Sequence, residues 1–207
     1  MTSGLTTVIF DLGNVLIEWD RKNLFGKLID DPADLDRFLD EVFTMEDNAR
    51  LDSGTPLAEV AADCIARHPN EADLISAIID RWEEMLGPVI QGSVDILSEL
   101  HERGVRLLAL SNWGKDTFAM IEANYPFFEL FEGMVISGRE GVVKPNREIF
   151  DILTERYGVT PGEAVFIDDS AANIASSTML GFDSLLFENA ERLRQQLVYR
   201  QLLDVNL

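Results

Sequence analysis

From Gly92 onward the sequence alternates between strand-like and helix-like segments, and this alternation strongly limits the folds open to the chain. Short apolar runs typical of buried strands are separated by stretches whose apolar residues recur at helical spacing. Strands are expected at residues 105–110, 134–136, 164–167 and 184–187, and helices at residues 92–103, from about 115, at 146–157, at 171–180 and from 190. Such alternation predicts an α/β fold, in which helices cover both faces of a parallel sheet.

The region before Gly92 has a different pattern. A first apolar run, residues 7–10, predicts one more buried strand, and only helical signals follow it. Each predicted helix starts with a cap residue or a first-turn proline, and the helices span residues 31–43, 55–67 and 70–86. We therefore predict a core domain of residues 1–17 and 90–207, interrupted by a small helical cap of residues 18–89.

Composition excludes several classes of function. The 37 acidic and 17 basic residues give a formal net charge of −20, which repels nucleic acids and anionic membranes. No apolar run approaches a membrane span, the N-terminus does not resemble a signal peptide, and the single Cys64 fits a reducing compartment. We expect a cytoplasmic monomer or weak homodimer with no nucleic-acid or membrane partner. Because the chain has two histidines and no cysteine cluster, any metal should be a hard cation bound by oxygen.

Polar residues follow the predicted strands at the points where the strands end. Asp11 ends the first run, and Gly13 and Asn14 after it suit a turn. Ser111 and Asn112 follow the strand at 105–110. Open α/β sheets bind their ligands at the carboxyl ends of the strands, so these side chains are expected at one edge. Taken singly, each has an ordinary structural explanation as a turn former or a helix cap.

Two further segments lead to the same edge of the sheet. Asp168 and Asp169 end the strand at 164–167, and Asn173 follows one helical turn later. Adjacent carboxylates at a buried strand end repel each other unless a cation or proton compensates them. Pro145, next to the helix at 146–157, suits a first helical position and would place Lys144 beside a helix N-terminus, where anions bind. These segments together offer four kinds of group at one sheet edge: a nucleophile, anion ligands, a cation and a metal site. Such a set suits phosphoryl transfer.

These groups resemble, in their order and spacing, the four motifs of the haloacid dehalogenase superfamily, and the resemblance covers nearly the whole sequence. The first motif reads Asp-Leu-Gly-Asn at residues 11–14, as in the phosphatase-like branch with the all-helical C1 cap. The resemblance implies a Rossmann-like core with five parallel strands in the order 5-4-1-2-3. It also implies that Asp11 attacks phosphorus and forms an aspartyl-phosphate, which water then hydrolyses.

The resemblance further implies roles for the other motif residues. Mg²⁺ would be bound by an Asp11 oxygen, the Gly13 backbone carbonyl and Asp169, with Asp168 and Asn173 beside these ligands. Three groups would bind the phosphoryl oxygens: Ser111, the Asn112 backbone amide and Lys144.

The first motif departs from the usual pattern of the family's phosphatases at one position. They usually carry Asp-x-Asp, whose second Asp protonates the leaving oxygen and later activates water, whereas this chain has Gly13 there. Proton transfer is worth about 10²–10⁴-fold in rate, so slow turnover is expected on poor leaving groups unless a water or a substrate hydroxyl substitutes. Some relatives whose first motif also reads Asp-Leu-Gly-Asn nevertheless resemble sugar-phosphate phosphatases.

Three functions therefore stay open at this point. The leading one is a Mg²⁺-dependent phosphatase that cleaves phosphate monoesters of a small metabolite such as a sugar phosphate. The second is a 2-haloacid dehalogenase-like hydrolase acting through an Asp11 ester, which the Asp168-Asp169 pair disfavours. The third is a weakly active phosphate-binding or regulatory protein. Substrate contacts are expected from residues beside the cap hinge, in the polar turn 46–54 and after the second motif: Glu18, Trp19, Asp20, Asn48, Arg50 and Trp113.

Overall fold

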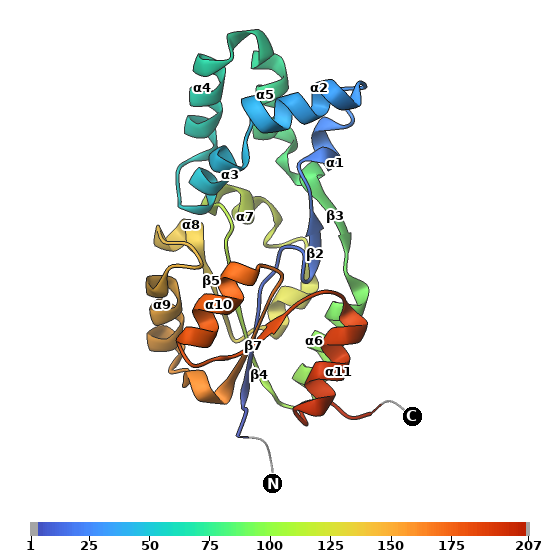
Figure 1. Cartoon of the computed structure of the whole chain (residues 1–207), viewed down its shortest axis with the longest axis vertical. Coiled ribbons are helices and arrows are strands. Elements are labelled where there is room, and N and C mark those ends of the chain that lie inside the picture. Colours follow the sequence, from blue (N-terminus) through green and yellow to red (C-terminus); the bar gives the residue numbers. More distant parts are fainter. Residues whose placement is uncertain (1–3, 206–207) are drawn as a thin grey trace.

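The computed structural model describes residues 4–205, and a five-stranded parallel sheet lies at its centre (Figure 1). Its strands are β1 (Thr7–Phe10), β4 (Arg106–Ser111), β5 (Gly133–Ile136), β6 (Ala164–Asp168) and β7 (Asp183–Leu186). The spatial order is β5-β4-β1-β6-β7. When the strands of this sheet alone are counted along the chain and the sheet is read from its β7 edge, this order is 5-4-1-2-3. The predicted α/β fold with a Rossmann-like parallel sheet is confirmed.

Helices cover both faces of the sheet because alternate residues of each strand point to opposite sides. Val8 and Phe10 pack on one face and Ile9 on the other, and all three are fully buried. The first face lies against α6 (Gln91–Glu102) and α11 (Ala190–Tyr199), and the second lies against α9 (Arg147–Tyr157) and α10 (Ala171–Met179). The central strands are therefore buried on both faces, as their continuous apolar runs indicate.

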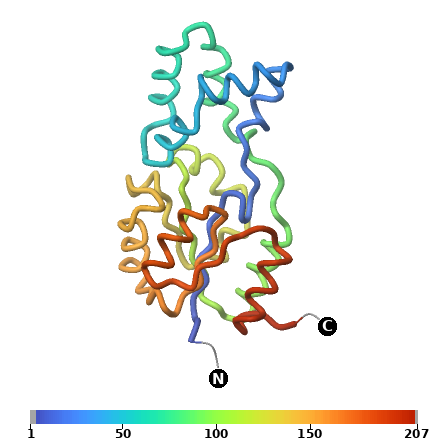
Figure 2. Tube along the Cα trace, viewed as in Figure 1, coloured from blue at the N-terminus to red at the C-terminus, as the bar shows by residue number. Residues whose placement is uncertain are grey.

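The segment between β1 and α6 forms a helical region, residues 22–85, beyond one end of the sheet (Figure 2). Its helices are α1 (Lys22–Phe25), α2 (Pro32–Arg37), α3 (Met45–Asp52), α4 (Leu57–Arg67) and α5 (Ala72–Arg81). Two short antiparallel strands, β2 (Ile17–Trp19) and β3 (Leu86–Val89), carry the chain to this region and back. The sequence analysis did not predict this pair of strands.

Two predicted helices differ from the observed ones. The helix expected at 31–43 does start with Asp31, whose side chain accepts hydrogen bonds from the backbone of Ala33 and Asp34. Its regular α-helical part ends at Arg37, however, and continues as a π-helical turn to Val42. The helix expected at 70–86 spans only Ala72–Arg81 in the structure. A 3₁₀ turn and then β3 follow it.

The C-terminal end of α3 is fixed to the end of β5. A capping box between Thr44 and Asp47 sets the start of α3. At its other end the backbone carbonyl of Asp52 accepts a hydrogen bond from Ser137 Oγ at 2.5 Å. Ser137 is fully buried and opens α8 (Ser137–Glu140), directly after β5. The helical region is thereby anchored beside the carboxyl edge of the sheet.

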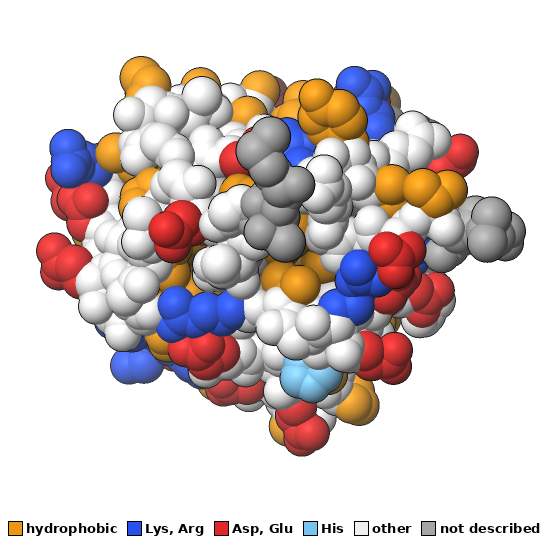
Figure 3. Space-filling model, turned by 90° about the horizontal axis from the view of Figure 1, so that it is seen from below, with side chains coloured by type: hydrophobic (Ala, Val, Ile, Leu, Met, Phe, Trp, Pro, Cys, Tyr) orange, Lys and Arg blue, Asp and Glu red, His pale blue; other side chains and the backbone are white. Residues whose placement is uncertain are grey.

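Charged residues of both signs are mixed on one face of the molecule. On the face opposite the helical region, acidic and basic side chains lie among one another and do not gather in one patch (Figure 3). No helix in the described part of the chain is long and apolar enough to cross a membrane.

Candidate functional site

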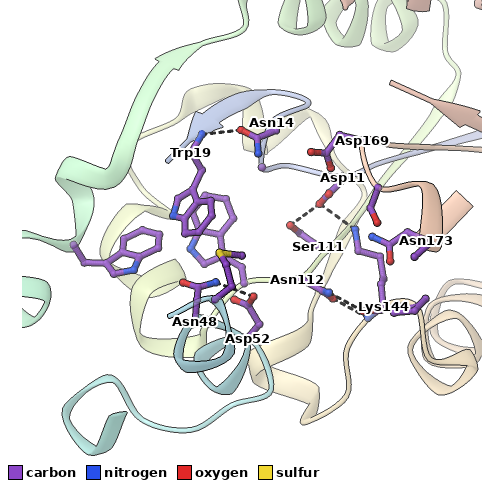
Figure 4. A pocket seen from close by; sticks show the side chains of 17 residues that line it. Asp11, Asn14, Trp19, Asn48, Asp52, Ser111, Asn112, Lys144, Asp169 and Asn173 are labelled. Atoms are coloured by element: carbon purple, nitrogen blue, oxygen red, sulfur yellow. Dashed lines mark hydrogen bonds and ion pairs between the residues drawn. The ribbon is translucent and has the colours of Figure 1, made fainter. Parts of the chain in front are cut away.

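The carboxyl ends of the central strands and the helical region enclose a pocket of about 340 Å³ (Figure 4). The core contributes most of the residues that the sequence analysis selected: Asp11, Gly13, Ser111, Asn112, Lys144, Asp169 and Asn173. These residues come from strand ends, loops and the first turn of α10, and they lie up to about 160 positions apart in the chain. Parallel strand topology brings them to one edge. The predicted convergence of four chain segments is therefore present in the structure.

Asp11 lines this pocket and is 8% exposed. Its Oδ1 accepts hydrogen bonds from the Leu12 backbone at 2.7 Å and from Ser111 Oγ at 2.7 Å, and it lies 3.1 Å from Lys144 Nζ. Among residues 4–205 the structure records no hydrogen bond to Asp11 Oδ2. Burial raises the pKa of Asp11 to about 7, although the Lys144 charge and the Ser111 hydroxyl oppose this. One oxygen is thus held in place and the other is available for reaction.

Lys144 is buried between two carboxylates. Its Nζ donates to Asp168 Oδ2 at 2.7 Å and to the Leu110 carbonyl at 2.7 Å, in addition to its contact with Asp11. Burial alone would lower the pKa of Lys144, but the Asp11 and Asp168 charges raise it above its ordinary value. The ammonium group therefore stays charged within the site and can neutralise a bound anion.

The backbone of Lys144 is held by Asn112. The Asn112 side chain accepts from the Lys144 backbone N–H at 2.8 Å and donates to the Lys144 carbonyl at 2.9 Å. The prediction that Pro145 begins a helix is wrong: α9 starts at Arg147, with Asn146 as its N-cap. Lys144 is positioned by Asn112 and by buried carboxylates, and not by a helix N-terminus.

Three carboxylates come together beside Lys144. One oxygen each from Asp11, Asp168 and Asp169 lies within 4.8 Å of the others. Asp168 is fully buried and already accepts from the Ser170 backbone at 2.8 Å and from Asn173 Nδ2 at 2.9 Å. Asp169 is more exposed, and burial together with the Asp168 charge raises its pKa. This crowding of acidic oxygen atoms, with one free oxygen on Asp11, fits a hard divalent cation.

The predicted substrate contacts divide into two groups. Trp19, Asn48 and Trp113 line the pocket. Glu18, Asp20 and Arg50 do not: Asp20 accepts from the Lys22 backbone at 2.8 Å, and Arg50 pairs with Asp63 on α4. The prediction that these three residues contact substrate in the pocket is therefore not supported by their positions.

The pocket also contains residues that sequence reasoning missed: Met45, Asp52 and Trp82. Asp52 falls inside the polar turn 46–54, but nothing in its sequence context distinguishes it from the neighbouring polar residues. With Trp82 in the wall, all three tryptophans of the chain line this pocket. Within the described residues, the indole N–H groups of Trp82 and Trp113 are buried and have no hydrogen-bond acceptor.

The ionisation of Asp52 gives a first testable prediction. Burial and the Asp11 charge raise the pKa of Asp52 from 3.8 to about 7. Between these two pH values folded Asp52 binds a proton that the unfolded chain has released, so stability falls as pH rises through this window. In EDTA, Asp52→Asn should raise the Tm relative to wild type by more at about pH 8 than at about pH 5. Equal Tm differences at both pH values would contradict the raised pKa, and exposed Asp40→Asn in the same region is the matched control.

Comparisons with known proteins agree with this geometry. A family model described as haloacid dehalogenase-like hydrolase matches residues 5–178. The chain is 26% identical to D-ribitol-5-phosphate phosphatase of Bacteroides thetaiotaomicron, an alignment that covers 93% of this chain and 97% of the relative. It is 23% identical to sesquiterpene phosphatase astK of Aspergillus oryzae. That alignment covers 89% of this chain and 91% of the relative. In drimenol cyclase drtB of Aspergillus calidoustus, 24% identical, the chain spans only 35% of the relative's length.

A solved structure has the same fold. The HAD family enzyme bt-2542 of Bacteroides thetaiotaomicron, in complex with magnesium and inorganic phosphate, superposes with a TM-score of 0.66 at 23% identity. The match covers 89% of this chain and 95% of that one.

Proposed function

The chain belongs to the haloacid dehalogenase-like hydrolase family, and we propose that it is a Mg²⁺-dependent phosphatase that cleaves a phosphate monoester of a small metabolite. One observation carries this proposal: Ser111 and Lys144 hold one oxygen of Asp11, and the other oxygen, beside the carboxylate of Asp169, has no hydrogen bond to any of residues 4–205. The phosphatase names of two relatives and the magnesium and phosphate in the bt-2542 complex support the same activity.

The protein side chains would divide the reaction into two displacements. Asp11 Oδ2 attacks phosphorus and the ester oxygen leaves, which gives an aspartyl-phosphate that water hydrolyses. Ser111, the Asn112 backbone amide and Lys144 bind the phosphoryl oxygens, and the positive charge of Lys144 offsets their negative charge.

Asp11, the Gly13 carbonyl and Asp169 would hold Mg²⁺, which neutralises phosphoryl charge when it is bound. Asp168 and Asn173 act on this set indirectly. Asn173 and Lys144 both hydrogen-bond Asp168, and Asp168 in turn fixes the position of Lys144 beside Asp11. We propose that the helical region serves as the cap that closes over the bound phosphate.

The pocket wall favours a sugar or polyol phosphate as substrate. Tryptophan rings accommodate the apolar faces of a carbon chain or sugar ring, and Trp19, Trp82 and Trp113 line this pocket. Asn48 and Asp52 add polar groups from α3.

An activity panel tests the proposed function. Sugar and polyol phosphates, a terpenyl phosphate and 2-haloacids are incubated with the enzyme in Mg²⁺ and, separately, in EDTA. We expect phosphate release from a sugar or polyol phosphate in Mg²⁺ and its loss in EDTA. Without the metal ion, the negative phosphoryl oxygens would lie beside the negative carboxylates of Asp11 and Asp169 with no divalent cation between them. Halide release in EDTA would establish the dehalogenase alternative, and no turnover of any compound would favour a binding or regulatory role.

A further inference from the structure

The proposed phosphatase reaction needs a proton at the leaving oxygen, and position 13 cannot supply it. Gly13 has no side chain, and a Cβ atom built there would meet no other atom of residues 4–205 within 4 Å. The core side of the pocket thus has open space at the position where a second carboxylate would lie. Because proton transfer to the leaving group contributes about 10²–10⁴-fold, a donor elsewhere in the pocket would have a large effect.

The helical region places a carboxylate on the other side of the same pocket. Asp52 is the last residue of α3, and Figure 4 shows it with Asn48 across the pocket from Asp11 and Asp169. Its position is fixed at two points. Asn48 Nδ2 donates to Asp52 Oδ2 at 3.1 Å, and Ser137 Oγ donates to its backbone carbonyl.

The side on which Asp52 lies decides what it can do. In phosphoryl transfer the attacking and leaving oxygens lie roughly in line through phosphorus. With Asp11 as the attacking group, the leaving oxygen points away from the sheet edge and toward the helical region. We propose that Asp52 is the general acid and base of this active site, taking the role for which the first motif has no side chain. This inference rests on the proposed phosphatase function.

The charges around Asp52 suit both halves of this role. Burial and the Asp11 carboxylate raise its pKa to about 7, while Lys144 and the Asn48 hydrogen bond oppose the rise. A general acid and base works best with a pKa near the working pH, since both protonation states are then accessible. The geometry across the pocket and the ionisation of Asp52 therefore point to the same function.

The proton returns to Asp52 in each turnover. As the bond between Asp11 and phosphorus forms and the ester bond breaks, protonated Asp52 donates to the leaving oxygen, which departs as an alcohol. Ionised Asp52 then accepts a proton from the water that enters the vacated position. That water attacks phosphorus, the bond to Asp11 breaks, and inorganic phosphate leaves while Asp52 is again protonated.

Asp52→Asn separates this role from a structural one, because the effect depends on the leaving group. Single-turnover rates are measured with an alkyl phosphate that wild type hydrolyses and with 4-nitrophenyl phosphate, whose leaving group needs no proton. We expect the alkyl ester rate to fall by about 10²–10⁴-fold and the nitrophenolate burst to stay within a few-fold of wild type. Steady-state nitrophenolate release should also slow, since water attack lacks its base. The exposed Asp40→Asn should leave all three rates unchanged.

A second variant keeps the test decisive if Asp52→Asn perturbs folding. Gly13→Asp fits the open space at that position, and in the Asp52→Asn background it should restore at least tenfold of the lost alkyl ester rate. Equal losses on both esters with no restoration by Gly13→Asp would overturn the role of Asp52, as would an unchanged alkyl ester rate in Asp52→Asn. Either result leaves the phosphatase proposal intact, because that proposal is tested on wild type, by phosphate release in Mg²⁺ and its loss in EDTA.

Discussion

Asp11→Asn is expected to lower Mg²⁺-dependent phosphate release by on the order of 10⁴-fold or more, because it removes the atom that forms the covalent intermediate. The carboxamide has nearly the same shape as the carboxylate, so Ser111 Oγ can still donate to the Oδ1 position. Steady-state assays of the purified variant on the best sugar or polyol phosphate measure this effect.

The structure also predicts that this loss is chemical and not a loss of folding. Asp11 is buried and its pKa is raised to about 7, so a neutral side chain at this position removes a poorly solvated charge. In EDTA at about pH 8 the Tm of Asp11→Asn should equal or exceed that of wild type. Activity within tenfold of wild type would show that Asp11 is not the nucleophile.

Lys144→Met is expected to lower the free energy of unfolding by about 3–5 kcal/mol, the usual cost of breaking a buried ion pair by removing one partner. Methionine has a similar length, but it leaves Asp168 and Asp11 without the ammonium group that lies 2.7 and 3.1 Å from them. Urea denaturation at about pH 8 in EDTA measures this cost. Phosphate release should also fall, since the phosphoryl oxygens lose a cationic ligand.

Two further variants identify the cause. Adding Asp168→Asn to Lys144→Met removes one of the two carboxylates that lose their partner, and it should recover part of the lost stability. Arg147→Met, which breaks an exposed pair with Asp151, should cost only about 0–1 kcal/mol. A cost below about 1 kcal/mol for Lys144→Met would mean that the buried carboxylates do not depend on this lysine.

The core of the site could be predicted because its residues end recognisable strands. The apolar runs before Asp11, Ser111 and Asp168 are fully or nearly fully buried in the structure, and parallel pairing of β1, β4 and β6 brings their ends together. The apolar runs of the sequence thus place these side chains at strand ends without knowledge of any long-range contact. Lys144 was also selected, but for the wrong reason, since Asn112 and Asp168 position it.

The wall contributed by the helical region could not be predicted in the same way. Asp52 reaches the pocket because Ser137, 85 positions later in the chain, holds the end of α3. Trp82 lies in a 3₁₀ turn where helical spacing had predicted a continuous helix. Neither place follows from local pattern, because both depend on how the helical region packs against the sheet. The sequence does not predict β2 and β3 because neither is a continuous apolar run: Glu18 interrupts β2, and Gly87 and Pro88 interrupt β3.

The most direct measurement of the mechanism is acid trapping of the covalent intermediate. Wild type and Asp52→Asn are mixed with 4-nitrophenyl phosphate in Mg²⁺, quenched in acid within a turnover and digested for mass spectrometry. We expect one added phosphoryl group on the peptide that contains Asp11, with higher occupancy in Asp52→Asn because hydrolysis of the intermediate is slowed. Rapid phosphate release with no phosphoryl group on that peptide, or with the group on another residue, would contradict nucleophilic catalysis by Asp11.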